Sequence, residues 1–193
     1  MNNVRNTGMG PTFGLAQAPS LSPWRTKADA LLHNLNDGMI TVRDNFARAL
    51  PTDEVDNVLK TGTLRLIQPG EPLALKGQGK THEYVIISGN VRVTADPTVA
   101  QISAGESGNT IAVLGRGEWT GLSGKPTWQA NLHATEETVV LAVPHATLEA
   151  LKLTYPSVAQ AATQISHDRL QRIADVEAPH KSPSTTVDIF YDN

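Results

Sequence analysis

Hydrophobic positions along the 193-residue chain follow two different spacings. Between Trp24 and Leu35 the apolar residues recur at helical intervals, so that they fall on one face of a helix. Between residues 64 and 143 short apolar runs alternate with polar residues and are separated by Gly, Pro and Asn, which indicates strands joined by turns. Helical spacing returns after Pro144. The pattern predicts a strand-rich centre with helices at both ends.

Three helices are predicted before the strands. Ser22 and Pro23 are expected to be the N-cap and the first position of a helix that runs to about Leu35. A second helix is predicted over 40–50, and a short third one over 53–60. All three come before the first predicted strand.

The central region is predicted to form about eight short strands. Ser88-Gly89-Asn90 supplies a tight turn, and the Pro/Gly/Ser-rich segment 96–109 is expected to be a surface loop. The strands are expected around residues 64–67, 73–75, 84–87, 91–93, 110–114, 119–120, 129–134 and 138–143. Short strands with turns between them predict a mainly β fold, an eight-stranded jelly roll or β-roll.

Two helices are predicted after the strands. The first is short and contains Leu148 and Leu151, and the second is longer and runs from Pro156 to Ala174. The apolar spacing of the longer helix is only partly heptad-like, because Arg169 interrupts one seam. This helix can therefore pack on the roll or form a dimer interface.

The chain length suits one domain with tails. Residues 1–21 are rich in Asn, Gly, Pro and Ser and are predicted to be a disordered tail. Residues 22–174 are expected to form a single domain. Residues 175–193 contain two prolines and are predicted to be a flexible tail.

Composition narrows the function classes. The formal charge is −3 and there is no block of Lys and Arg, so no nucleic-acid partner is expected. No apolar run approaches the ~20 residues that cross a bilayer, so no membrane association is expected. The chain has no cysteine, which excludes disulfides and thiolate zinc sites and favours a cytoplasmic protein.

Three segments follow one another through the strand region: PGEPLALKGQGKTHEYVIISGNVRV, IAVLGRGEWTG and NLHATEETVVLAVPHATLEAL. In this order they resemble the cyclic-nucleotide-binding domain family, the sensor half of catabolite activator proteins and the regulatory domains of kinases and channels. The likeness covers about residues 46–174 and implies the β-roll of that family. The matching positions are Gly70, Gly77, Tyr84, Ile86, Ser88, Gly89, Val91, Val93, Ile111, Leu114, Gly117, Trp119 and Gly121.

The resemblance also implies a ligand cassette, which this chain does not match. Family members that bind cyclic nucleotides carry Gly-Glu, a short helix and then Arg-Ser/Thr-Ala, where the Arg pairs with the cyclic phosphate. Gly121 and Ala130 match the Gly and the Ala. Leu122 stands in the place of the Glu, and Trp128 or Gln129 in the place of the Arg. Nucleotide binding is therefore predicted to be lost.

The candidate ligand residues come from this degenerate cassette. The amides of the GLSG segment, with Lys125, could form an anion nest, but a tight turn with a solvated Lys is the favoured interpretation. Trp128 is predicted to fill the space of the missing nucleotide. The full candidate set is Gly121, Leu122, Ser123, Gly124, Lys125, Trp128 and Ala130.

A cupin-like metal site is a further alternative, since cupins share the roll. His82 and Glu83 resemble the end of a cupin metal motif, and His133 on another strand could join them. Lys80, however, stands where the motif has its first histidine. His82 is better explained as a turn residue and His133 as a solvent-facing strand residue, so no metal is predicted.

No acyl-transfer, P-loop or dinucleotide motif is present, so neither an enzyme nor a cofactor is predicted. The sequence favours a non-catalytic interaction or regulatory module, with a protein partner or self-association. A helix-turn-helix is not expected in the residues after the last predicted helix. The alternatives are a small-molecule sensor with an altered cassette and a cupin-like metal-binding protein.

Overall fold

The computed structural model describes residues 21–97, 103 and 108–177. The described helices include α1 (Ser22–Asn36), the 3₁₀ helix η1 (Phe46–Ala49), α2 (Thr52–Thr61), α4 (His145–Thr154) and α5 (Pro156–Glu177). The strands are β1 (Thr63–Ile67), β2 (Pro72–Ala74), β3 (His82–Ser88), β4 (Val91–Thr94), β5 (Thr110–Leu114), β6 (Asn131–Ala134) and β7 (Thr138–Pro144).

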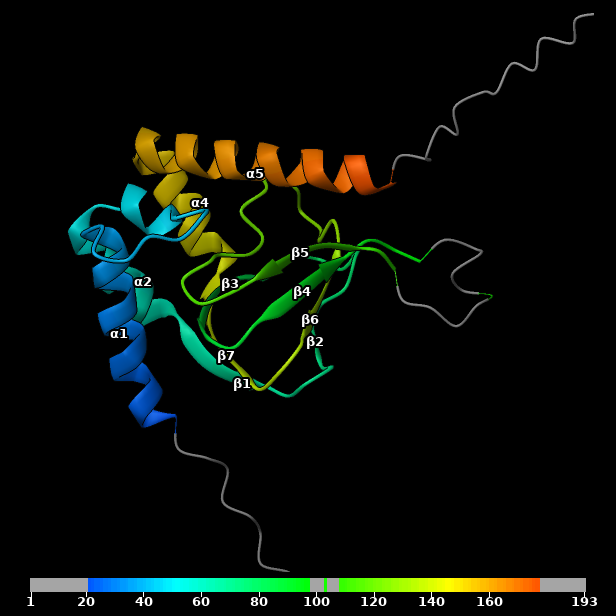
Figure 1. Ribbon diagram of the computed structural model, residues 1–193. Coiled ribbons are helices and arrows are strands. Elements are labelled where there is room, and N and C mark those ends of the chain that lie inside the picture. Colours follow the sequence, from blue (N-terminus) through cyan, green and yellow to red (C-terminus); the bar gives the residue numbers. More distant parts are fainter. Residues whose placement is uncertain (1–20, 98–102, 104–107, 178–193) are drawn as a thin grey trace, which may run out of the picture.

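The strands form two antiparallel sheets, which confirms the predicted mainly β roll with flanking helices (Figure 1). One sheet has the order β1-β7-β3 and the other the order β2-β6-β4-β5. The described residues contain seven strands instead of about eight. The predicted short strand at 119–120 is reduced to an isolated bridge between Trp119 and Val85.

The two sheets enclose one hydrophobic core, and the helices enclose a second one. Alternate residues of β3 point to opposite sides: Tyr84 and Ile86 join the core between the sheets, whereas Val85 and Ile87 join the core under the helices. Strand β7 divides its side chains in the same way. Because both faces of these strands are buried, residues 84–87 of β3 and 139–143 of β7 are continuous apolar runs without polar alternation.

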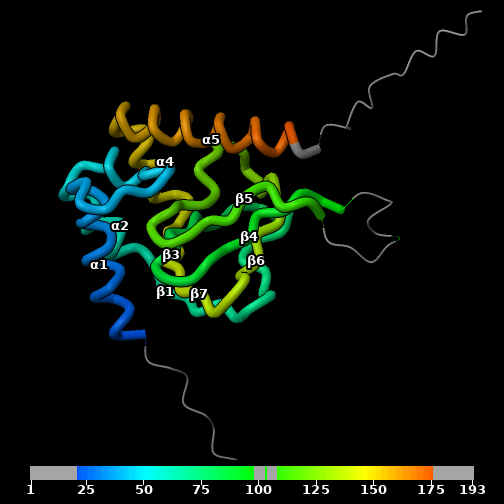
Figure 2. Tube along the Cα trace, viewed as in Figure 1, coloured from blue at the N-terminus to red at the C-terminus, as the bar shows by residue number. Residues whose placement is uncertain are grey.

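Helices α1, α2 and α4 pack together beside the β1-β7-β3 sheet, and the tube view shows the same grouping (Figure 2). Helix α5 leaves this group and crosses the roll toward β5 (Figures 1 and 2). Its first half buries Val158 and Ala162 in the helical core. Helix α5 therefore contacts both the helical layer and strand β5 of the four-stranded sheet.

One predicted helix is wrong. Over 40–50 only η1 is helical, and side-chain amides on both sides of this segment tie it to α1. Asn36 Nδ2 donates to Ala47 O and Leu50 O, each at 2.8 Å, and Asn45 Nδ2 donates to Leu35 O at 3.0 Å.

The other helix boundaries differ less. Helix α1 begins at Ser22, so the N-cap is Leu21, without a side-chain hydrogen bond, and not Ser22 as predicted. Residues 1–20 and 178–193, most of the two predicted tails, lie outside the described residues, and residues 175–177 are part of α5.

Candidate functional site

The segment from Gly115 to Ala130, which we call the cassette segment, crosses between the two cores. Trp119 is fully buried and meets the Phe46 ring edge-on, with 5.0 Å between ring centroids and 65° between planes. This places Trp119 in the core, as the resemblance implies. Gly117 and Gly121 both have positive φ angles, of 86° and 76°, so the segment turns sharply on each side of Trp119.

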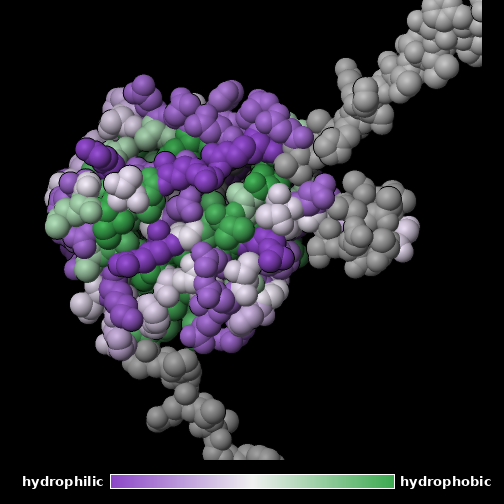
Figure 3. Space-filling model, viewed as in Figure 1, coloured by the Kyte–Doolittle hydropathy of each residue, from purple (hydrophilic) through white to green (hydrophobic). Residues whose placement is uncertain are grey.

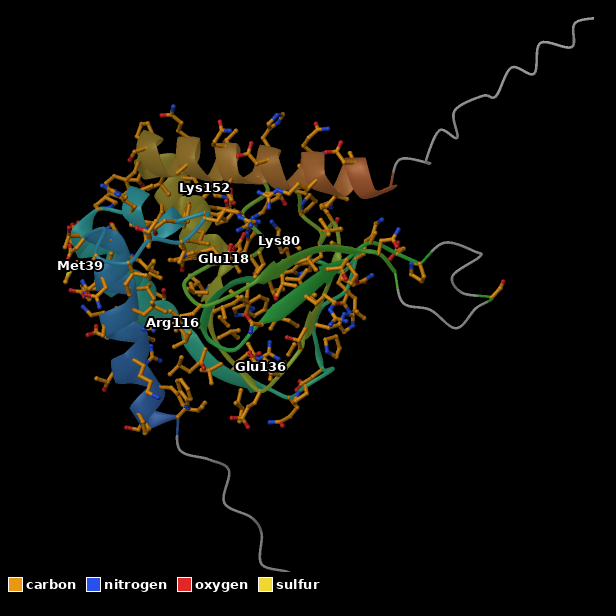
Figure 4. The ribbon with its side chains drawn as sticks, in the orientation of Figure 1. Met39, Lys80, Arg116, Glu118, Glu136 and Lys152 are labelled. Atoms are coloured by element: carbon orange, nitrogen blue, oxygen red, sulfur yellow. The ribbon has the colours of Figure 1, made fainter. Side chains whose placement is uncertain are left out.

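The side chain of Lys80 binds the backbone of the cassette segment. Its side chain is fully buried, and Nζ donates to the carbonyl oxygens of Gly121 and Ser123, each at 2.5 Å. Figure 4 shows Lys80 in the middle of the molecule below α5. The carbonyl oxygens of Gly121 and Ser123 thus face a buried ammonium group. An anion nest would instead present backbone N–H groups to a negatively charged ligand.

Lys80 belongs to a chain of charges that ends at the surface of α4. Nζ lies 3.5 Å from Glu83 Oε1, and His145 Nδ1 lies 3.0 Å from the same oxygen. Glu149 Oε1 lies 3.8 Å from His145 Nδ1 and accepts from Lys152 Nζ at 2.7 Å. Burial raises the pKa of Glu83 and lowers the pKa of Lys80, and each opposes the other's shift. The Lys80–Glu83 ion pair therefore holds the cassette segment in place, and the burial of its two charges costs desolvation free energy.

A cavity of about 90 Å³ lies between the cassette segment, the β2-β6-β4-β5 sheet and the second half of α5. Its walls are mostly apolar, and Figure 3 shows hydrophobic surface directly below α5. The lining residues from the strands are Val93, Ile111, Ala112, Leu114 and Leu132, and those from α5 are Ser166, Arg169, Leu170, Arg172 and Ile173.

The structure brings together part of the predicted candidate set. Gly121, Leu122, Ser123, Trp128 and Ala130 border the cavity. Gly124 and Lys125 are exposed and do not line it. The buried cation at the turn is Lys80, whereas Lys125, the cation of the alternative anion nest, is exposed.

Trp128 lines the cavity. Its indole is 7% exposed and stacks on the Tyr84 ring, with 5.9 Å between centroids and 16° between planes. Gln129 also lines the cavity, but its Nε2 is held by Thr127, with 2.9 Å to the carbonyl oxygen. Leu122 is 2% exposed and packs into the helical core. The two positions that the resemblance assigns to a Glu and an Arg are thus filled by packed side chains.

Two arginines that the cassette comparison missed reach the cavity from α5. Arg169 Nε donates to Asp44 Oδ2 at 2.9 Å, and Arg169 Nη1 donates to Trp119 O at 2.5 Å. Nη2 of Arg169 is buried and has no partner among the described residues. Burial lowers the pKa of Arg169, and Asp44 opposes that shift. The one signal in the sequence was that Arg169 interrupts the apolar seam of its helix.

The structure separates the residues that the cupin-like alternative would use as ligands. His133 lies on β6 in one sheet, whereas His82 and Glu83 lie on β3 in the other. Among the described residues Glu83 instead converges with His145 and Glu149, and a second group of possible ligands consists of Asp29, His33 and Asp56. Lys80 and Lys152 already neutralise the first group, so it is an ion-pair chain. The second group is mainly exposed.

Within the described part of the chain, no helix combines the length and the apolarity needed to cross a membrane.

Comparison with known proteins identifies the roll. Residues 64–155 match the model of the cyclic nucleotide-binding domain family. No curated protein sequence matches the chain significantly.

Many solved structures match with high probability. The catabolite activator protein of Thermus thermophilus is 30% identical, over 68% of this chain and 60% of that one, with a TM-score of 0.54. FixK2 of Bradyrhizobium japonicum is 19% identical, over 59% of this chain and 55% of that one, with a TM-score of 0.51. The sensor domain of the transcriptional regulator DNR of Pseudomonas aeruginosa is 15% identical, over 82% of this chain and 98% of that one, with a TM-score of 0.56.

The chain thus spans 55% of FixK2 and 60% of the Thermus protein, and it covers nearly all of the isolated DNR sensor domain. The family match, the two-sheet roll and the helices that follow it agree with one another. Residues 64–155 of this chain are therefore a domain of the cyclic nucleotide-binding family.

Proposed function

We propose that this chain is a non-catalytic regulatory module that acts through protein contacts and does not bind cyclic nucleotides. The observation that carries the proposal is the position of Trp128, whose indole is stacked on Tyr84 where the resemblance implies a phosphate-binding Arg. A buried indole supplies no counter-charge for a phosphate, and an unpaired buried phosphate is costly.

The space beside Trp128 supports the same conclusion. The cavity of about 90 Å³ is well below the roughly 300–1,000 Å³ that is typical of small-molecule sites. Leu122, at the position that the resemblance gives to the ribose-binding Glu, is buried among apolar side chains and offers no acceptor. A cyclic nucleotide would therefore have to displace packed core residues.

The regulatory part of the proposal comes from the relatives. The Thermus protein is a catabolite activator, and DNR is a transcriptional regulator. Helix α5 offers a contact surface, because its 22 residues run along the outside of the roll. Helix α5 also borders the cavity, so a partner on its outer surface would bind the same helix that closes the cavity.

Titration calorimetry tests the proposal with the full chain and cyclic AMP or cyclic GMP. We expect no heat of binding for the natural sequence. Micromolar binding by the roll would contradict the proposal. A variant with Leu122→Glu and Trp128→Arg is the matched positive test, since it restores both polar groups of the cassette; a gain of binding in that variant alone assigns the loss to these two positions.

A second candidate function is a sensor for a different small molecule. The specific observation in its favour is the unpaired Arg169 Nη2 on a guanidinium group that borders an apolar cavity.

A further inference from the structure

A second cavity, a groove of about 480 Å³, lies on the outward face of the four-stranded sheet. Neighbouring strands β4 and β6 form its floor (Figure 1), with Arg92 and Thr94 from β4 and Asn131 and His133 from β6. Leu132, between the two β6 residues, belongs to the core between the sheets, so alternation along the strand directs its neighbours outward. The groove is therefore separate from the cavity below α5, and its volume is within the roughly 300–1,000 Å³ typical of small-molecule sites.

Arg92 and His133 place two hydrogen-bond donors side by side in this groove. They are partners in the β4–β6 register, and residues directly opposite each other in an antiparallel pair have Cβ atoms about 4.5–5.5 Å apart. Arg92 is exposed and His133 is half-buried. Within the described parts of the chain, neither the guanidinium group of Arg92 nor the ring of His133 forms a hydrogen bond or an ion pair. Both side chains are therefore available to an acceptor that enters the groove.

The acidic residues near the groove limit the charge of a ligand. Glu71, Asp96 and Glu136 each directly follow a residue that lines the groove. Each already has a partner: Lys76 Nζ lies 3.3 Å from Asp96 Oδ2, a backbone amide donates to Glu71 at 3.0 Å, and a side-chain amide donates to Glu136. These carboxylates repel a ligand with many negative charges, such as a nucleic acid or a strongly acidic peptide. The arrangement fits a compact ligand with one anionic group and a neutral polar body.

We propose that this groove binds a small phosphate monoester with a neutral polar body, of the sugar phosphate class. Two phosphate oxygens accept from the forked guanidinium group of Arg92, and the third accepts from the imidazole N–H of His133. The hydroxyl group of Thr94 contacts the polar body of the ligand. This inference goes beyond the proposed function, because it assigns a ligand to the outside of the roll and does not depend on Trp128.

The two donors select a phosphate over a carboxylate and over a neutral sugar. A carboxylate has two oxygens, and both are used by the guanidinium fork, so His133 is left with a weaker, shared acceptor. A neutral sugar offers no anionic oxygen, and hydrogen bonds to charged groups are roughly twice as strong as neutral ones. We therefore expect the phosphate ester to bind at least about tenfold more tightly than the neutral sugar, with the carboxylate between them.

The experiment titrates the full chain, labelled with ¹⁵N, with glucose 6-phosphate, gluconate and glucose, and follows the backbone amides by NMR. The expected result is saturable binding of glucose 6-phosphate, with the largest shifts at the amides of β4 and β6. No saturable binding in the millimolar range, equal binding of glucose, or shifts confined to other elements overturns the proposal. Inorganic phosphate that binds as tightly as glucose 6-phosphate overturns the assigned ligand class, because the polar body would then contribute nothing.

Three variants locate the site. Arg92→Gln should weaken binding of glucose 6-phosphate at least about tenfold, and Arg92→Lys should have a smaller effect, because lysine keeps the charge but not the fork. Arg116→Gln is the matched control, since Arg116 is also exposed but does not line the groove. Equal losses in Arg92→Gln and Arg116→Gln would show a general charge effect and contradict the site.

The exposure of Arg92 keeps this test independent of folding. Its replacement removes no hydrogen bond within the described residues, so the urea midpoints of the three variants should equal that of the natural chain. Cyclic AMP in a parallel titration separates the two proposals. Shifts of the cassette-segment amides with cyclic AMP overturn the proposed function, whereas the response of β4 and β6 to glucose 6-phosphate decides the inference on its own.

Discussion

Gly121 and Trp128 are packed so closely that a Cβ atom built on Gly121 would lie 2.8 Å from Cη2 of the indole. The same Cβ atom would lie 2.9 Å from Glu83 Cγ. Gly121 also has a φ of +76°, which favours glycine. The cassette turn thus requires glycine both for its backbone and for its space.

Gly121→Ala is expected to destabilise the fold by about 3 kcal/mol, the sum of a left-handed backbone cost and a packing cost. Two control glycines separate these costs. Gly77 has a φ of +83° with open space at its Cβ position, so Gly77→Ala should cost only about 1 kcal/mol. Gly124 has open space and is not among the described positive-φ glycines, so Gly124→Ala should be nearly neutral. Urea unfolding measures all three, and equal losses at Gly121 and Gly77 would exclude the packing cost.

Trp128→Ala is expected to reduce the free energy of unfolding by about 3–5 kcal/mol, because it removes a buried indole from between the sheets. Trp128→Phe keeps a ring against Tyr84 and should cost much less. Trp24→Ala is the matched control, since Trp24 is half-buried and contacts Lys27 at the surface, 3.9 Å from Nζ to the ring centroid. A loss at Trp128 no larger than that at Trp24 would show that the indole does not hold the core.

Lys80→Met should cost about 3–5 kcal/mol, because it leaves the Glu83 carboxylate buried without its cation. Adding Glu83→Leu should recover part of this loss, since the charge is then absent. The recovery is incomplete because the Gly121 and Ser123 carbonyls lose their donor. Lys76→Met is the surface control, where the ion pair with Asp96 at 3.3 Å is worth about 0–1 kcal/mol. Chemical unfolding of the natural chain and these three variants checks this order.

Glu149 gives a pH-dependent prediction. Burial alone would raise its pKa, but the hydrogen bond and charge of Lys152 outweigh burial and lower it. A carboxylate whose folded pKa lies below its unfolded value stabilises the protein above the unfolded pKa, about 4.3, and loses that contribution as the pH falls through the folded pKa. The side chain is 41% exposed, so screening keeps the contribution below about 1 kcal/mol.

The check is a comparison of the natural chain with Glu149→Gln. The natural chain should be the more stable one at pH 6, and the difference should shrink below about pH 4 as Glu149 is protonated. Asp53→Asn, an exposed acid in the first turn of α2, controls for general loss of negative charge. A difference that grows as the pH falls would contradict the sign of the shift.

The roll could be predicted from the sequence because its turns are local. Ser88-Gly89-Asn90 joins β3 to β4, and Gly89 has a φ of +84° that the turn requires. The segment 40–50 could not be predicted in this way, because the amides of Asn36 and Asn45 tie it to α1 and only the folded chain brings these amides to their acceptors.

The candidate site could also be predicted only in part. Leu122 and Trp128 were identified from the cassette, since a resemblance compares residues that are neighbours along the chain. Lys80 and Arg169 come from 41 and 50 residues away from the groups they contact. No local pattern links a lysine before β3 or an arginine in α5 to the turn at Gly121, so the cations of the site emerge only from the fold.

Strands β3 and β7 face two cores at once, and this limits which substitutions the sequence can accept there. Along these strands every inward or outward substitution meets packed side chains, so natural variants there should exchange only apolar residues of similar volume. The outward face of β4 and β6, where Arg92 pairs with His133, has no such constraint. Relatives of this domain are therefore expected to keep the residues of the β1-β7-β3 sheet nearly unchanged. New polar or charged side chains are expected on the outward face of the β2-β6-β4-β5 sheet.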